Sequence, residues 1–171
     1  MAYTTNWKIV APNHIGYQPI ASTSATKQHE LGTTVQARDH GSNQNGMGEF
    51  VYVKGVANGL AGSVVTINAD DGTVTLAVAN AVGPVGVLMS ALTASLYGWA
   101  QIKGKAVGLV LAGFADNADC YLTSTDGSVD DTDVAGDYVR GMKGASAIDG
   151  PATGFAELEL FYPQVADGKD N

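Results

Sequence analysis

From residue 49 onward, apolar and polar side chains alternate in short runs separated by turn-forming residues. Residues 49–54, 63–68 and 73–78 are rich in β-branched or aromatic residues, and the last two runs flank an Asp-Asp-Gly turn at 70–72. Two such runs around a turn predict a β-hairpin. Further strands are predicted at residues 84–92, 107–112, 120–123, 138–142 and 155–162.

Short strands between Gly, Asp and Asn turns are typical of sandwiches and barrels. The sequence therefore predicts an all-β protein with a compact β-sandwich or β-barrel body over residues 49–163. Residues 90–96 are the only helix-compatible stretch and suffice for a single turn. Residues 164–171 are mostly polar, which predicts a flexible C-terminal tail.

Residues 1–48 differ from this body because their large apolar residues follow no regular period. The segment ends in a cluster of Ser, Asn, Gln and Gly over residues 42–48, which is typical of a loop. We expect an extended N-terminal arm that lies along another surface and is poorly ordered alone. Its spaced apolar anchors include Trp7, Ile9, Val10, Tyr17 and Ile20.

The glycine-rich stretch 97–115 contains a Gly-Lys pair, which raises the question of a phosphate-binding loop. A P-loop places four residues between its first glycine and a Gly-Lys-Ser/Thr triplet, and a helix follows. Here five residues separate Gly98 from Gly104, and Ala106 stands where the hydroxyl residue is required. The residues that follow have a strand pattern, so the stretch does not fit a nucleotide-binding loop.

A different property of this stretch is its polar alternation. Gln101, Lys103 and Lys105 alternate with apolar residues or glycine, which predicts a strand with one polar face. Bases are rare in the body, so these three side chains form a candidate contact face.

Charge and composition narrow the function classes. The chain has 171 residues and a net charge of −8, which argues against a nucleic-acid partner. Charged residues make up 15%, against about 25% in typical soluble domains. Two interpretations stay open: burial against other subunits, or a compact β protein with an uncharged polar surface. We expect no signal peptide, because residues 1–10 lack a basic n-region and a long apolar h-region. We expect no membrane span, because Asn80, Gly83 and Pro84 interrupt the longest apolar-rich stretch.

Candidate catalytic and metal-binding residues do not form a known motif. The histidines, His14, His29 and His40, lie in the N-terminal segment without zinc-ligand spacing. The acidic run at 130–133 lacks EF-hand spacing, and the single cysteine, Cys120, has apolar neighbours typical of a buried inert thiol. We therefore expect no enzyme activity, no metal and no cofactor.

Four segments carry a resemblance to a known family. They are the entry strand at 48–55, the Pro-Val-Gly-Val run at 84–87, the Tyr-Gly-Trp-Ala-Gln-Ile-Lys-Gly run at 97–104 and the segment 149–157. Together with the sequence around them, over residues 31–162, they resemble head decoration (capsid cement) proteins of tailed bacteriophages.

This resemblance implies a small, β-rich, non-catalytic virion protein. Such proteins bind the outside of the head, often as homotrimers, over joints between major capsid protein subunits, and are made in the host cytoplasm. Under this interpretation the anchors of the arm bind the capsid or a neighbouring copy.

Two other functions stay open. The first is another virion component, such as a head fibre base or a tail or receptor-binding module. The second is a glycan-binding module, for which Tyr97, Trp99 and Tyr121 are the candidate aromatic residues.

Overall fold

A computed structural model describes residues 5–10, 16–41 and 45–166, which form eleven β-strands and no helix. The predicted all-β fold class is confirmed. The strands are β1 (Trp7–Ile9), β2 (Thr34–Asp39), β3 (Met47–Lys54), β4 (Val64–Ile67), β5 (Val74–Leu76), β6 (Val82–Leu88), β7 (Tyr97–Leu109), β8 (Asp119–Leu122), β9 (Val129–Asp130), β10 (Tyr138–Gly144) and β11 (Phe155–Ala166).

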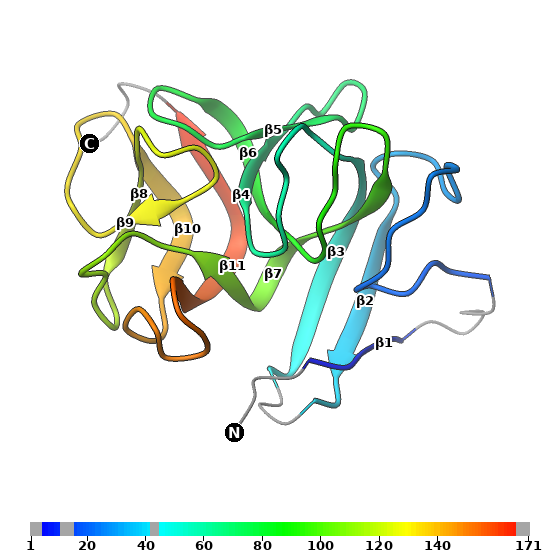
Figure 1. Cartoon of the computed structure of the whole chain (residues 1–171), viewed down its shortest axis with the longest axis horizontal. Helices are drawn as coiled ribbons and strands as arrows, with labels where there is room; N and C mark the ends of the chain where they lie inside the picture. Colours follow the sequence, from blue (N-terminus) through cyan, green and yellow to red (C-terminus); the bar gives the residue numbers. More distant parts are fainter. Residues whose placement is uncertain (1–4, 11–15, 42–44, 167–171) are drawn as a thin grey trace.

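All eleven strands belong to one connected sheet with antiparallel pairing between neighbouring strands. Its main path runs β1-β2-β3-β7-β6-β11-β10-β8-β9, and the β4–β5 hairpin joins through β6. In Figure 1 the β8–β10 end lies on the left and the β1–β3 end on the right. The predicted hairpin around residues 70–72 is present as β4–β5.

The central strand, β7, is longer than the sequence pattern predicts. Its first half pairs with β3 and its second half pairs with β11, so it joins the two ends of the sheet. The change of partner occurs at Gly104, whose φ is +91°. A side chain there would collide with the carbonyl oxygen of Met47. Glycine is required because it alone adopts this φ freely and leaves room for the neighbouring strand.

The strands alternate between different parts of the core. On β3, Phe50 and Tyr52 join an aromatic cluster with Trp99, whereas Val51 and Val53 face a second, valine-rich cluster. A third cluster lies between β6, β7, β10 and β11. Both faces of β3 and of the first half of β7 are therefore buried. Residues 90–96 form a turn and no helix, with Leu96 N–H donating to the carbonyl of Thr93.

The N-terminal segment contributes two strands to this sheet. β1 pairs with β2, and β2 pairs with β3, so residues 34–39 are part of the body's sheet and not of a separate arm. The β2 side chains alternate exposed and buried, as expected for a strand with one covered face. At the other end, β11 extends to Ala166, which places residues 164–166 of the predicted tail in a strand. Residues 167–171 lie outside the described residues.

Candidate contact surface

Of the three residues of the predicted contact face, Gln101 does not belong to the surface. Gln101 is fully buried, and its Nε2 donates to the carbonyls of Lys103 at 3.0 Å and Lys105 at 3.1 Å. The face that Gln101 shares with Trp99 is covered by Phe50 and the N-terminal segment. Sequence alone does not show which face of a strand is covered.

Lys103 and Lys105 are partly exposed, and both have partners. The Nζ of Lys105 forms an ion pair with Glu157 Oε2 at 2.7 Å. The Nζ of Lys103 lies 5.4 Å from the ring centre of Phe161 and 5.3 Å from that of Tyr162. This distance is within the range of a cation–π interaction.

The two rings beside Lys103 are unusually exposed. Phe161 is 67% exposed and Tyr162 is 46% exposed, and the rings meet edge to face at 5.5 Å. The Tyr162 hydroxyl donates to Glu49 Oε2 at 2.9 Å, and this hydrogen bond raises the pKa of Tyr162 above its usual value. Lys103, Phe161, Tyr162 and Glu49 are called the β7–β11 surface below.

One residue of this surface has a strained backbone conformation. Tyr162 has a φ of +47°, which is costly for a bulky residue and is retained where surrounding structure enforces it. Across the β10–β11 pair, Gly141 also has a positive φ, and a Cβ atom there would lie 2.5 Å from the carbonyl oxygen of Phe161. The crowded backbone thus holds the two rings in a defined position.

A groove adjoins the β7–β11 surface. It encloses about 540 Å³ and is lined by residues of β7, β8, β10 and β11, including Phe161, Met142, Lys143 and Glu159. Its mixed apolar and charged lining suits a polypeptide segment better than a single small anion, since it contains both lysines and acids.

The five predicted anchors of the arm lie in different environments. Trp7 and Ile20 are buried in the aromatic cluster of this chain, Ile9 and Tyr17 pack partly against it, and Val10 is exposed. Trp7 and Ile20 are therefore covered by the chain's own body and do not face outward. The apolar spacing identified residues that need burial, but it did not identify what buries them.

Gln18 explains how the N-terminal segment is attached, and sequence analysis missed it. Its backbone N–H donates to His29 Nε2 at 3.1 Å, and its carbonyl accepts from Trp99 Nε1 at 2.9 Å. Its side chain accepts from the Tyr52 hydroxyl at 2.8 Å and donates to the carbonyls of Ser22 and Tyr97. A lone glutamine between Tyr17 and Pro19 carries no sequence signal for this role.

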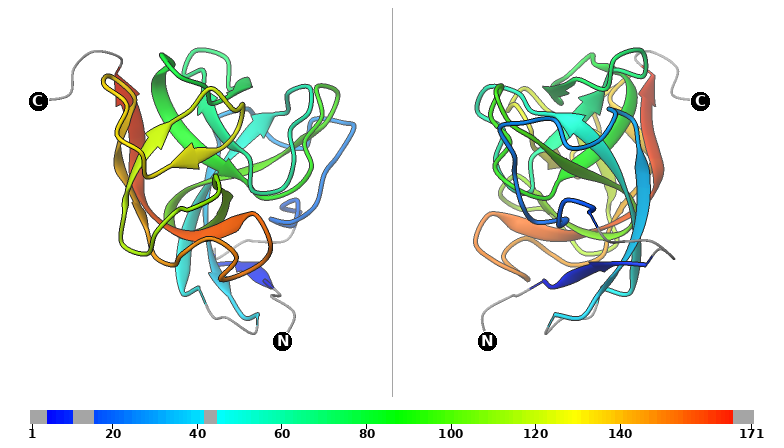
Figure 2. Two further views of the ribbon diagram at one scale, coloured as in Figure 1. Left: turned by 60° about the vertical axis from the view of Figure 1, so that its left-hand side comes forward. Right: turned by 90° about the vertical axis from the view of Figure 1, so that its right-hand side faces the viewer.

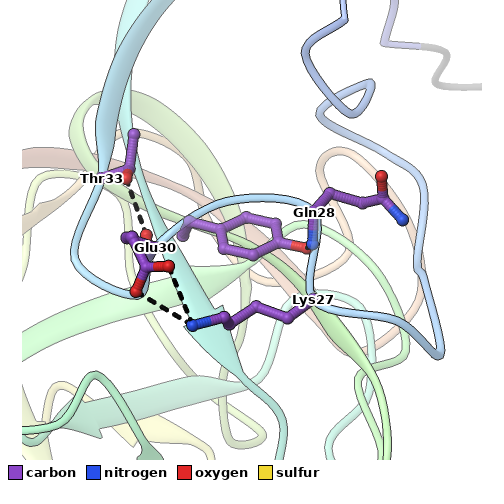
Figure 3. Close-up of polar contacts among 5 residues, drawn as sticks. Lys27, Gln28, Glu30 and Thr33 are labelled. Atoms are coloured by element: carbon purple, nitrogen blue, oxygen red, sulfur yellow. Dashed lines mark hydrogen bonds and ion pairs between the residues drawn. The ribbon is translucent and has the colours of Figure 1, made fainter.

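The following loop closes over the same tyrosine. The N–H of Gln28 donates to the Tyr52 hydroxyl at 3.2 Å. Figure 3 shows the ion pair between Lys27 and Glu30 beside it, and the Thr33 hydroxyl donating to the carbonyl of Glu30. In the right-hand view of Figure 2, this segment passes in blue across the sheet. Trp99, a candidate glycan platform, is fully buried beneath it and does not serve that role.

The described residues hold no group of three or more His, Cys, Asp or Glu side chains placed to bind a metal. The Cys120 thiol is buried, and desolvation raises its pKa to about 12, so it is protonated and unreactive at neutral pH. Over the part of the chain that the structure describes, no helix could cross a membrane. His14 lies outside the described residues.

Comparison of the sequence with known protein families gives no match, and no curated protein is significantly similar to it.

The sequence analysis did not predict the β7–β11 surface. A signal existed in β11, where Glu157 and Glu159 alternate with buried residues and Phe161 stands at the next position expected to be polar.

Proposed function

We propose that this chain is a structural, non-catalytic virion protein that binds the outside of a tailed-phage capsid through the β7–β11 surface. The observation that carries the proposal is the exposed ring pair, Phe161 and Tyr162, held in place by Lys103 and Glu49. Large exposed aromatic residues in a rigid setting are typical of interaction hot spots. The resemblance to head decoration proteins supplies the identity of the partner.

Two further features support binding over catalysis. The mixed groove beside Phe161 extends the exposed apolar area, as expected of a surface that accepts a protein segment. Tyr162 retains a strained φ, and such strain is found where a side chain must be aimed at a ligand. The partner in this proposal is the major capsid protein, at the joints between its subunits.

Binding of the purified chain to empty shells of the major capsid protein from the same phage tests the proposal. We expect co-sedimentation of the wild type, and loss of about 2 kcal/mol, roughly thirtyfold in Kd, for Phe161→Ala. Leu60→Ala is the matched control, because Leu60 is 56% exposed and lies outside the β7–β11 surface. A wild type that does not bind the shells overturns the capsid proposal, and equal binding by Phe161→Ala overturns the assignment of the surface.

Copy number and oligomeric state provide an independent test. A decoration protein occupies hundreds of sites on a shell, so weak contacts add by multivalency when copies associate. We propose a homotrimer, and native mass measurement of the purified chain checks it. A few copies per particle in a quantified virion would instead favour a head fibre base or a tail component.

A further inference from the structure

Two side chains that line one small cavity beside β7 each carry a buried polar atom without a partner. The atoms are Trp7 Nε1, a donor, and Gln101 Oε1, an acceptor. Trp7 is 8% exposed and Gln101 is fully buried. A buried polar group left without a hydrogen bond costs about 1–3 kcal/mol, so two on the same cavity require an explanation.

The orientation of the Gln101 amide is determined by the bend in β7. Both N–H groups of Nε2 are used by the carbonyls of Lys103 and Lys105, on either side of Gly104. An exchanged amide would place its oxygen against two carbonyl oxygens, so Oε1 is the atom left to accept. Gly48 provides the space, since a Cβ atom there would lie 3.0 Å from Gln101 Nε2.

Trp7 is held just as firmly. Its ring meets Phe50 edge to face at 4.9 Å, and Trp7 pairs with Asp39 in the β1–β2 ladder. The Asp39 carboxylate accepts from the backbone N–H groups of Asn6 at 2.7 Å and Gly41 at 2.8 Å, which secures the strand end next to Trp7. The indole N–H is therefore positioned before any ligand arrives.

The cavity encloses about 160 Å³, and Leu88, Met89 and Phe155 contribute apolar walls. Lys105 also lines it, but its ammonium group is paired with Glu157. Thr5 and Asn45 line the cavity as well, and the Asn45 backbone N–H donates to Asp39 Oδ2. Trp7 and Gln101 together thus offer one donor and one acceptor, with no unpaired charge beside them. A carboxamide matches this set, because its oxygen accepts and its N–H donates while it carries no charge.

We infer that this cavity binds a single amide group of a partner polypeptide, either an Asn or Gln side chain or a main-chain amide. The volume admits a group of a few heavy atoms and is larger than the roughly 30 Å³ that one water occupies in the liquid. The inference does not depend on a capsid as partner, and its test contains none, so it stands or fails separately from the proposed function.

The experiment is an NMR titration of the ¹⁵N-labelled full chain with acetamide. The chain has two tryptophans, so two indole N–H resonances are observed. We expect a saturable shift of the Trp7 resonance and no shift of the Trp99 resonance, because Trp99 Nε1 is bonded to the Gln18 carbonyl. N,N-dimethylacetamide is the matched ligand control, since it accepts from Trp7 but donates nothing to Gln101.

Trp7→Phe keeps a ring and removes only the N–H donor, so it serves as the matched variant. Followed through the backbone amide of Ala61, which also lines the cavity, acetamide should bind this variant about fivefold more weakly. A shift that never saturates, equal shifts of both indoles, no shift, or equal affinity for dimethylacetamide would each overturn the inference and leave a site for water only. If Trp7→Phe does not fold, the difference in wild-type affinity between acetamide and N,N-dimethylacetamide is the test of the inference.

Discussion

Two groups of aromatic residues lie on β7 or next to it. One group is covered by other parts of the chain, and the other is exposed. Tyr17, His29, Tyr52 and Trp99 pack ring against ring under the N-terminal segment. Every described polar atom of Gln18, at the centre of this closed group, has a hydrogen-bond partner. Phe161 and its neighbour Tyr162, by contrast, are exposed.

The two halves of β7 have different surroundings. Up to Gln101, β7 is covered on both faces, and its rings stabilise the fold. After Gly104, it pairs with β11, and the exposed rings next to that pairing contribute little to the core. The bend at Gly104 separates the two regions, because it changes the partner strand of β7. Substitutions in the two regions are therefore expected to differ in their effect on stability.

The largest effect is expected for Trp99→Ala in the closed group. Removing a fully buried Trp deletes its ring contacts and its hydrogen bond to Gln18, which should lower the free energy of unfolding by about 3–5 kcal/mol. Urea denaturation followed by circular dichroism measures it. A loss below 1 kcal/mol, on the scale of a surface substitution, would contradict the closed packing.

Gly104→Ala is expected to come next, because it attacks the boundary between the two regions. The substitution adds a strained φ and a collision with the carbonyl of Met47, for a loss of about 1–3 kcal/mol or more in unfolding free energy. Gly113→Ala is the control, since Gly113 also has a positive φ but nothing within 4 Å of its added Cβ. Equal losses in denaturant titrations of the two variants would show that β7 is not crowded at Gly104.

A smaller change in the free energy of unfolding is expected when the pH is lowered. Desolvation lowers the pKa of His29 below 6.5, and its Nε2 accepts from Gln18, so the folded state favours the neutral ring. The unfolded chain therefore binds more protons, and this contribution to stability is present above pH 6.5 and lost as pH falls toward the lowered pKa. The rings of Tyr17 and Tyr52 contact His29, and the Lys27–Glu30 pair lies on the same loop.

Denaturation midpoints of the wild type and His29→Phe between pH 7.5 and pH 5.5 check this. We expect the variant to lose part of the pH dependence of the wild-type midpoint. Identical slopes would show that the His29 ring is free to take up a proton in the folded state.

The smallest effect on stability is expected for the exposed pair, Phe161 and Tyr162. Phe161→Ala should change the free energy of unfolding by no more than about 0.5 kcal/mol, as for other surface substitutions. The same substitution at Phe114, which is buried, should cost about 3–5 kcal/mol. Thermal and urea denaturation of the pair measure the contrast, and a comparable loss at both positions would remove the distinction between the two groups.

Local pattern was enough to predict the strands of the body but not their partners. The hairpin at residues 64–76 and the strands at β3, β8, β10 and β11 follow from short apolar runs between turn residues. The split of β7 between β3 and β11 depends on contacts between residues far apart in the sequence, so no local pattern reports it. The same limit applies to Trp7 and Ile20, whose apolar character indicated burial without indicating where.

The sequence by itself determined that this protein is all-β, because alternation with a period of two and Gly/Asp turns are properties of neighbouring residues. It also placed Lys103 and Lys105 on one strand stretch, and predicted an unreactive Cys120. Only the tertiary structure decided which face of β7 is covered, and this covering buries Gln101. It also decided that Phe161, on the neighbouring strand β11, is exposed. Burial depends on what packs against a strand, and here the covering segment is the N-terminal chain, more than sixty residues away along the sequence.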